Sequence, residues 1–297
     1  MIAKAAAAAR GSRSYRFFES ARMAFSHYLA AGAYSGSDTI LLPAYIGWSP
    51  REGSGVFDPI AARAIHPVFY RMSGSLEIDV DHLRECIEQT SARALLIVHY
   101  FGYVDASYGR VLRLARDAGL EIIEDEAHAM LSDLIGGICG RESDVALYSL
   151  HKMLPVSAGG ALVSNRDGGD SAAAAQIWRH DLAAIAARRR ANARWLASAI
   201  AGLEDEVVPL RPVLREGEIP QTFPVCLKHA DRNCVYREMN AAGFGVVSLY
   251  HTLIDAIEKR DFPASGLLAS RILNLPVHQD VTVPDLECLV ARLKQAL

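Results

Sequence analysis

Two short segments of the sequence combine an apolar run with a polar ending that could do chemistry. In LEIIEDEAHA the run Glu121–Asp125 ends in acidic residues, and in VALYSLHK the run Val145–Ser149 leads directly to His151 and Lys152. A lysine just beyond a strand can be partly desolvated, which lowers its pKa toward the neutral amine that forms an imine. Asp125, at a strand's carboxyl end, lies where open α/β sheets bind ligands and could pair with a protonated pyridine nitrogen. We therefore expect an imine-forming amine and an anionic ring partner around one aldehyde cofactor.

Each segment also has a purely structural interpretation. Glu124 and Asp125 could form a solvated turn that opens the next helix, and a lysine in a loop is usually a surface residue. Ser149 could cap a turn, and Gly159–Gly160 could be only a tight turn before a strand. The order of these segments along one chain favours the functional interpretation.

The elements that must position these residues alternate along the first part of the chain. Short apolar, β-branched runs predict strands, and longer stretches with apolar residues at three- and four-residue spacing predict helices. The expected strands are Thr39–Pro43, Pro67–Tyr70, Ala94–His99, Glu121–Asp125, Val145–Ser149 and Gly160–Ser164, and the expected helices are Tyr15–Ala31, Asp79–Gln89 and Ala106–Ala118. Such alternation implies an α/β fold, with a mainly parallel sheet between two helical layers.

The pattern changes in the second half of the chain. From Ser171 to about Leu203 it is Ala-rich and helical without a strong breaker, and the ending predicts a small α+β domain. The strands expected there are Pro220–Leu227, Gly245–Tyr250 and Ile272–Val277, and the helices are Asp231–Ala242 and Pro284–Ala296. The predicted plan is a flexible leader over 1–14, a large cofactor-binding domain over 15–170, a connector helix over 171–203 and a small domain over 204–297.

Composition narrows the class of protein. With 297 residues, 51% of them hydrophobic, and a formal charge of -3, the chain can bury a full core and has no basic footprint for nucleic acid. The five cysteines form no CxxC pair and no Cys/His cluster at metal spacing, so we expect no metal site, no disulfide framework and a cytoplasmic location. The N-terminus lacks the apolar region of a signal peptide, and no apolar run reaches the ~18 residues of a membrane span.

Three motifs in a fixed order carry a family resemblance: HYFG (99–102), IIEDEAHA (122–129) and SLHK followed by AGGALVSN (149–165). Together they resemble the aminotransferases of the DegT/StrS group, which depend on pyridoxal 5′-phosphate (PLP) and act mainly on nucleotide-linked keto sugars. FFESARMAF and ILLPAYIGW look like the group's first helix and second strand, and LNLPVHQD looks like its C-terminal strand. The resemblance implies a PLP-transferase-like fold, PLP as cofactor and a homodimer with the cofactor near its interface.

The resemblance also implies roles for individual residues around the cofactor. Lys152 would hold PLP as a Schiff base, Asp125 would pair with its ring nitrogen, and His128 would lie beside its ring. The residues expected at the cofactor phosphate are Ser149, Ser20, Ala21 and Arg22. The last three lie in the N-terminal part of an expected helix, where free N–H groups and the helix dipole favour an anion.

Further candidates lie at the edges of the implied site. Trp48 first and Tyr45 second could cover the exposed face of the ring, although both could instead be ordinary core aromatics. Tyr250, His251 and His278 lie where the small domain meets the cofactor cleft in similar proteins, and would contact substrate. A structural role for these histidines is at least as well supported. The run Arg188–Arg190 is expected on a solvated helix face.

The function implied by the resemblance is transfer of an amino group from an amino acid donor to a keto sugar in sugar or polysaccharide biosynthesis. Two alternatives stay open. The compact segment Ser149–Lys152 is similar to the SxHK signature of PLP enzymes such as cysteine desulfurases, which leaves an elimination or lyase reaction possible. The GxNxR loop, through which the partner subunit of such enzymes contacts the phosphate, has no counterpart in the sequence. This leaves a non-catalytic relative that binds a sugar or a partner protein.

Overall fold

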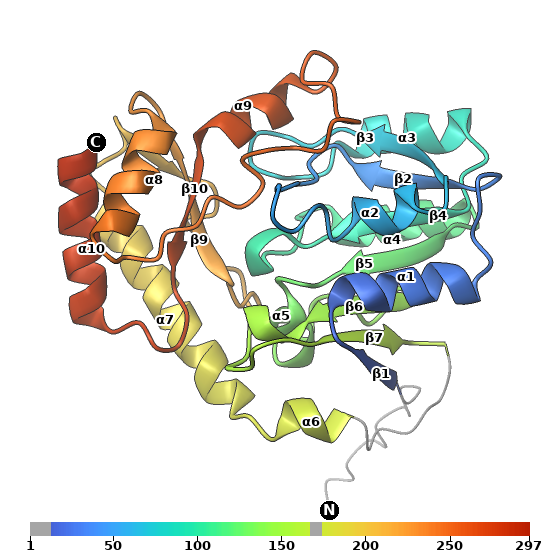
Figure 1. Ribbon diagram of the computed structural model, residues 1–297, viewed down its shortest axis with the longest axis horizontal. Helices are drawn as coiled ribbons and strands as arrows, with labels where there is room; N and C mark the ends of the chain where they lie inside the picture. Colours follow the sequence, from blue (N-terminus) through green and yellow to red (C-terminus); the bar gives the residue numbers. More distant parts are fainter. Residues whose placement is uncertain (1–12, 167–173) are drawn as a thin grey trace, which may run out of the picture.

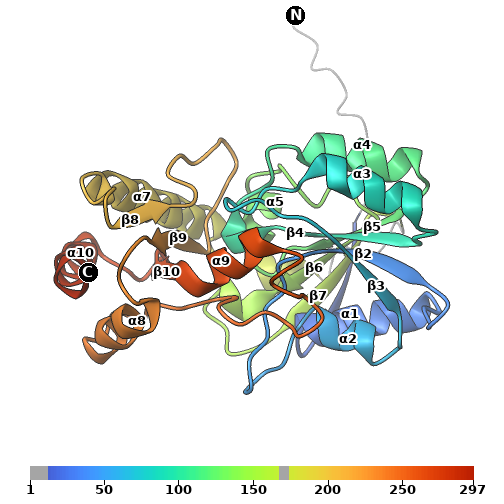
Figure 2. The same ribbon diagram turned by 90° about the horizontal axis from the view of Figure 1, so that it is seen from above.

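The computed structural model describes residues 13–166 and 174–297, and its strands form two sheets (Figures 1 and 2). The larger sheet has seven strands in the order β1-β7-β6-β5-β4-β2-β3, and the smaller has three in the order β10-β9-β8. The strands of the larger sheet are β1 (Ser14–Phe18), β2 (Thr39–Pro43), β3 (His66–Tyr70), β4 (Ala94–Val98), β5 (Glu121–Asp125), β6 (Val145–Ser149) and β7 (Gly160–Ser164). Those of the smaller sheet are β8 (Val207–Pro209), β9 (Thr222–Leu227) and β10 (Ile272–Pro276).

Helices cover both faces of the larger sheet, with α1 and α2 on one side and α3 and α4 on the other (Figure 2). The helices are α1 (Ala21–Ala31), α2 (Phe57–Ala61), α3 (Val80–Gln89), α4 (Tyr108–Asp117), α5 (Met130–Leu134), α6 (Ala175–Trp178), α7 (Leu182–Ile200), α8 (Arg232–Ala241), α9 (Pro263–Arg271) and α10 (Val283–Ala296). Two 3-10 turns, η1 (Tyr100–Gly102) and η2 (Leu150–Lys152), follow β4 and β6. Among the described residues, no helix combines the length and the apolar character needed to cross a membrane.

The predicted fold class is confirmed. Strands β2 to β6 are parallel, and β7 and β1 add an antiparallel edge. The central strands are buried on both faces, which is why they read as continuous apolar runs in the sequence. Parallel pairing brings the carboxyl ends of β4, β5 and β6 to one edge, where the chemically active residues follow.

The expected helix Tyr15–Ala31 is wrong in its first part. Residues Ser14–Phe18 form strand β1, which pairs antiparallel with β7, and the helix begins only at Ala21, after the N-cap Ser20. Tyr15 and Phe17 pack in one core cluster and Phe18 in another, so the apolar residues follow the two-residue period of a strand. Ser14, the last residue of the expected leader, belongs to β1, whereas residues 1–12 lie outside the described residues.

In the second half, strand β8 and helix α9 have no counterpart among the expected elements, and two of the expected segments take another form. Segment Gly245–Tyr250 forms no strand but a single bridge, between Val247 and Asn274, and ends at Tyr250 in a left-handed conformation with φ of 60°. The described part of the expected connector helix is two helices, α6 and α7, because Asp181 accepts a hydrogen bond from the backbone N–H of Ala184 and begins a new helix. Residues 171–173 lie outside the described residues.

The smaller sheet has its own core, formed with α7, α8 and α10 (Figure 1). Helix α9 and the segment before it behave differently, because Leu253, Ile254, Ile257 and Leu268 pack into the core of the larger sheet. This return of the chain to the larger sheet brings Tyr250 to the carboxyl ends of its strands, where it lines a cavity.

Candidate active site

A cavity of about 540 Å³ opens at the carboxyl ends of β5 and β6. Asp125, Ser149 and Lys152 all line it, and so does the N-terminal end of α1. The structure therefore brings together the amine and the carboxylate that the sequence marks as the chemical centre. Their charges interact: the Asp125 carboxylate acts to raise the pKa of Lys152, and Lys152 acts to lower that of Asp125.

The Lys152 amine contacts His128, whose Nε2 lies 3.0 Å from Nζ. The other ring nitrogen of His128, Nδ1, accepts a hydrogen bond from the backbone N–H of Phe101 at 3.3 Å. In a neutral imidazole one nitrogen accepts and the other donates, so Nε2 carries the proton and donates it to the lone pair of the lysine amine. Burial lowers the pKa of Lys152 and lowers that of His128 well below its usual range. Both effects favour a neutral amine beside a neutral imidazole.

Asp125 is 7% exposed, and its environment is set by the ends of two strands. Its Oδ1 accepts a hydrogen bond from the backbone N–H of Ala127 at 2.9 Å, which fixes the carboxylate toward the cavity side. Burial raises the pKa of Asp125, and the Lys152 ammonium and the Ala127 N–H oppose that rise. A cationic group placed in the cavity would stabilise the ionised carboxylate further.

The N-terminus of α1 forms one wall of the cavity, through Ser20, Ala21 and Arg22. Ser20 caps the helix by accepting from the backbone N–H of Met23 at 3.2 Å. The backbone N–H groups of Ala21 and Arg22 remain at the helix end, where an anion is favoured. A Cβ built on Gly160 would lie only 2.2 Å from the backbone N of Ala21. Glycine at 160 therefore lets the start of β7 approach the helix end, beside the loop that carries Lys152.

Of the remaining phosphate candidates, Ser149 lies in the cavity wall and is 3% exposed, with its Oγ 3.4 Å from Nδ1 of His151. Arg22 also lines the cavity, but its guanidinium points to the loop above it. It donates to the backbone oxygen of Glu52 and lies 3.5 Å from a carboxylate oxygen of Asp58. The Arg22 guanidinium is thus already bound by Glu52 and Asp58.

The aromatic candidates occupy three different places. Trp48 does not line the cavity and is 43% exposed, whereas Tyr45 is completely buried and lies beneath Tyr250, with ring centroids 5.5 Å apart. Tyr250 itself lines the cavity and contacts the His128 ring at 5.9 Å between centroids. Gly47 permits this arrangement, because a Cβ there would lie 2.6 Å from the Tyr250 ring. Tyr250 is therefore the aromatic ring, of these three, that faces the cavity.

A second cavity, of about 290 Å³, adjoins the first at His151 and Lys152. His278 lines it, whereas His251 is exposed and lines neither cavity. Arg189 also lines it and is only 3% exposed, so the expected solvated face is wrong for this arginine. Arg189 donates to the backbone oxygen of Gln221 at 3.0 Å, and burial lowers its pKa to about 10.

Sequence reasoning missed part of the wall. The segment Glu52–Val56 lines the first cavity opposite the strand ends, and the Glu52 carboxylate acts to raise the pKa of Lys152. The signal was the Gly- and Ser-rich stretch REGSG, which is typical of a loop that approaches a ligand closely. Ser157 and Ala158 were also missed, although they lie within the interval between Lys152 and Gly159.

Comparisons with known proteins find a family model that matches part of the chain and solved structures of similar fold. The model of the DegT/DnrJ/EryC1/StrS aminotransferase family matches residues 54–180, a segment that includes Asp125, His128 and Lys152. A comparison with curated protein sequences gives no match. The match to the family model confirms the resemblance that the motifs carry.

Solved structures of similar fold include several aminotransferases. A DegT DnrJ EryC1 StrS aminotransferase from Brucella abortus is 20% identical, with a TM-score of 0.76, covering 95% of this chain and 85% of that one. The putative sugar aminotransferase Spr1654 from Streptococcus pneumoniae, in its PMP form, is 16% identical, with a TM-score of 0.79 over 95% and 87%. DesV from S. venezuelae, solved with a ketimine intermediate, is 20% identical, with a TM-score of 0.74 over 96% and 85%. These likenesses confirm the fold.

Proposed function

We propose that this chain, whose residues 54–180 match the model of the DegT/DnrJ/EryC1/StrS aminotransferase family, is a PLP-dependent aminotransferase that transfers an amino group to a keto sugar. One observation supports this most directly: Lys152 and Asp125 line the same cavity, beside the N-terminus of a helix. An imine-forming amine, an anion for the ring nitrogen and a phosphate site are the three contacts that PLP requires from a protein.

The residues of the cavity fit this cofactor. The neutral amine of Lys152 would hold its aldehyde carbon, Asp125 would hold its ring nitrogen protonated, and the free N–H groups of Ala21 and Arg22 would receive its phosphate together with Ser149. When bound, the cofactor supplies an electron sink for the bond that breaks at the substrate carbon. His128 would lie beside the ring and orient the lysine amine.

The protein's own part in the reaction falls mainly to Lys152. The Lys152 amine would act as general base and then general acid, taking a proton from the carbon of a bound donor amino acid and giving it back. The hydrogen bond from His128 favours the unprotonated amine, which is the form that acts as a base. Tyr250 and Phe25 contribute apolar surface to the wall of the same cavity.

The substrate class follows from the family and from the second cavity. The solved neighbours include Spr1654 from Streptococcus pneumoniae, which is described as a putative sugar aminotransferase. The cavity of about 290 Å³ that adjoins Lys152 is lined by His278, Gln279, Asp280 and Arg189, and provides polar groups for a hydroxylated acceptor. We further propose that the acceptor is a nucleotide-linked sugar, that the enzyme acts as a homodimer, and that it is cytoplasmic, in keeping with its five free cysteines.

An elimination reaction at the same cofactor is the second candidate, because Ser149-Leu150-His151-Lys152 suits either chemistry. A half-reaction separates the two. In a transamination, PLP-loaded protein mixed with glutamate or glutamine and no acceptor converts its cofactor to the pyridoxamine form, about one equivalent per site. In an elimination, ammonia and a keto acid accumulate over many turnovers while the cofactor keeps its aldehyde form.

The second half-reaction identifies the acceptor. Protein in the pyridoxamine form is mixed with a panel of keto sugars, free and nucleotide-linked, and the return of the aldehyde form is followed by its absorbance. A nucleotide-linked sugar that restores the aldehyde form faster than its free counterpart is the expected result. Protein that shows no cofactor absorbance even with added PLP would instead support the non-catalytic relative.

A further inference from the structure

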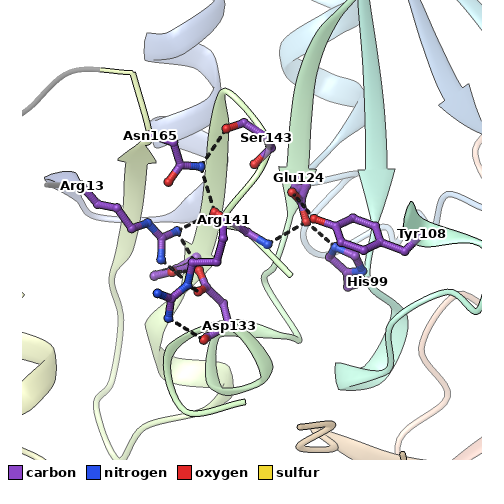
Figure 3. Close-up of polar contacts among 10 residues, drawn as sticks. Arg13, His99, Tyr108, Glu124, Asp133, Arg141, Ser143 and Asn165 are labelled. Carbon is purple, nitrogen blue, oxygen red and sulfur yellow. Dashed lines mark hydrogen bonds and ion pairs between the residues drawn. The ribbon is translucent and has the colours of Figure 1, made fainter. Parts of the chain in front are cut away.

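A second group of titratable side chains lies behind the strand that carries Asp125. Successive residues of a strand face opposite sides, so Glu124 points away from the cavity. Its carboxylate accepts from the Tyr108 hydroxyl at 2.8 Å and from the backbone N–H of Gly140 at 3.0 Å, and lies 2.6 Å from Nε2 of His99 (Figure 3). Glu124 is thus fully partnered, and it fixes the orientation of the His99 ring.

Glu126 lies on the same side of β5 and is not partnered in this way. It is completely buried, and among the described residues neither carboxylate oxygen accepts a hydrogen bond from a nitrogen or oxygen donor, although the Cys139 thiol lies close to it. The neighbouring Asp133 is neutralised by Arg13, at 2.7 Å, and by Arg141, at 2.5 Å, whereas no described cationic side chain forms an ion pair with Glu126. Burying an ionised carboxylate without a counter-charge costs free energy, so a cation bound at Glu126 would be stabilising.

Two soft or borderline ligands face that carboxylate. Nδ1 of His99 is buried and also lacks a hydrogen-bond partner among the described residues, and the buried thiol of Cys139 interacts with the Glu126 carboxylate. One ligand atom from each of these three residues lies within 4.8 Å of the other two. Three potential metal-ligand atoms with few hydrogen-bond partners therefore lie close together in the protein interior.

We propose that His99, Glu126 and Cys139 bind a divalent metal ion, with zinc as the ion that fits them best. An imidazole nitrogen, a thiolate and a carboxylate oxygen are all zinc ligands, and this mixture does not suit magnesium or calcium, which take oxygen ligands. The pair of His99 and Glu124 is the arrangement in which a ligating histidine gives its second N–H to a carboxylate. Three protein ligands leave one tetrahedral position for a water molecule.

The loop that carries Cys139 is shaped for close approach to this point. Gly140 has φ of 69°, and a Cβ there would lie 2.2 Å from Oε1 of Glu126 and 2.4 Å from Oδ2 of Asp133. A larger residue would therefore push the loop away and separate Cys139 from Glu126. No short spacing in the sequence marks this site, because His99 follows β4, Glu126 follows β5 and Cys139 lies in a loop after α5.

The proposed ion would brace the active-site edge of the sheet and take no part in the chemistry. The backbone N–H of His99 donates to the backbone oxygen of Asp125 at 3.1 Å, and Glu126 is the next residue in the chain. A metal ion bound to both His99 and Glu126 would fix the end of β4 to the end of β5, and so hold the Asp125 carboxylate in place. Removal of the ion should loosen this edge and lower the melting temperature.

The direct test is metal content and cobalt binding of the full-length protein. Protein purified without chelators should contain about one zinc ion per chain by elemental analysis. Chelator-treated protein titrated with Co²⁺ should bind about one equivalent and develop the intense absorption of a thiolate bound to cobalt. Zn²⁺ at a hundredfold excess over its Kd should raise the melting temperature of the treated protein by about 5 °C.

Matched variants separate this site from other metal-binding groups. Cys139→Ala should lose the thiolate-to-cobalt absorption, whereas Cys86→Ala, which removes another buried thiol far from the cluster, should keep it. Glu126→Gln should weaken Co²⁺ binding by at least about tenfold. Wild-type protein that contains no metal, binds no stoichiometric Co²⁺ and melts at the same temperature with and without Zn²⁺ would overturn the proposal, with Glu126 then carrying a proton instead.

Discussion

Replacement of His128 tests whether its ring keeps the Lys152 amine unprotonated. The imidazole accepts from the Phe101 N–H and donates from Nε2 to Nζ of Lys152 at 3.0 Å. A hydrogen bond donated to the neutral amine stabilises that form alone, so it lowers the pKa of Lys152 in the same direction as burial. Removing it with His128→Leu should therefore raise the pKa of Lys152.

The size of the effect follows from the single hydrogen bond. A hydrogen bond contributes about 1 kcal/mol net, and 1.36 kcal/mol corresponds to a tenfold change in a protonation equilibrium, so the neutral fraction of Lys152 should fall about fivefold at any pH below its pKa. Only the neutral amine attacks the cofactor aldehyde. The rate of PLP loading by His128→Leu should thus be about fivefold lower at such pH values and equal to that of the wild type well above the pKa.

The assay is stopped-flow mixing of cofactor-free protein with PLP from about pH 6 to about pH 9, with borohydride trapping to count covalent links. His128→Gln is the matched control, because the side-chain amide can accept from Phe101 with its oxygen and donate to Lys152 with its nitrogen. It should load like the wild type. Two results would refute the reasoning: a pH profile of His128→Leu that coincides with the wild type, or a His128→Gln variant that is as slow as His128→Leu.

Three further substitutions test the roles of neighbouring groups. Lys152→Ala should lose the borohydride-reducible link while its melting curve stays close to that of the wild type, and a persistent link would assign this role to another lysine. Asp125→Asn should still bind PLP, yet its turnover should fall by orders of magnitude because the amide does not hold the ring nitrogen protonated; near-normal turnover would remove the assignment. Gly160→Ala should lower the free energy of unfolding by about 1–3 kcal/mol in urea titrations and weaken PLP affinity, since its Cβ would meet the backbone of Ala21. Gly74→Ala, where a Cβ meets nothing within 4 Å, is its control, and equal losses in both variants would contradict this account.

The sequence was informative where local pattern and burial agree. The predicted strands Thr39–Pro43, Glu121–Asp125 and Val145–Ser149 match β2, β5 and β6 at both ends, because fully buried parallel strands require unbroken apolar runs between turn residues. The start of α3 was predicted from its capping residue, since Asp79 accepts a hydrogen bond from the backbone N–H of His82. Apolar runs and helix caps both involve residues that are close together in the sequence, so both can be recognised without the structure.

Prediction failed where distant residues decide the conformation. The aromatic residues of Ser14–Phe18 fit a helix pattern as well as a strand pattern, and only pairing with Gly160–Ser164 selects the strand. The burial of Arg189 has the same origin, because the carbonyl groups that receive its guanidinium belong to Met153 and to residues 220 and 221. No pattern within a single helix records such acceptors.

In the candidate site too, some residues are marked by their local sequence and others are placed only by contacts with distant residues. Asp125 and Lys152 were recognisable because each follows a buried strand, and parallel pairing of β5 with β6 brings both strand ends to one edge. The aromatic wall was not recognisable, because Tyr250 reaches the cavity only through the left-handed turn that returns the chain to the larger sheet. The same limit hid the cluster of His99, Glu126 and Cys139, whose members are separated along the chain by whole elements.

Strand β5 shows how one element serves two environments. Its period of two residues directs Asp125 into the cavity and Glu124 to the opposite side, where His99 and Tyr108 bind it. The backbone bond from His99 to Asp125 joins the two sides, so a change at the buried cluster reaches the carboxylate that would hold the cofactor ring. A substitution at His99, Glu126 or Cys139 should therefore alter the affinity for the cofactor, although none of these side chains would contact it.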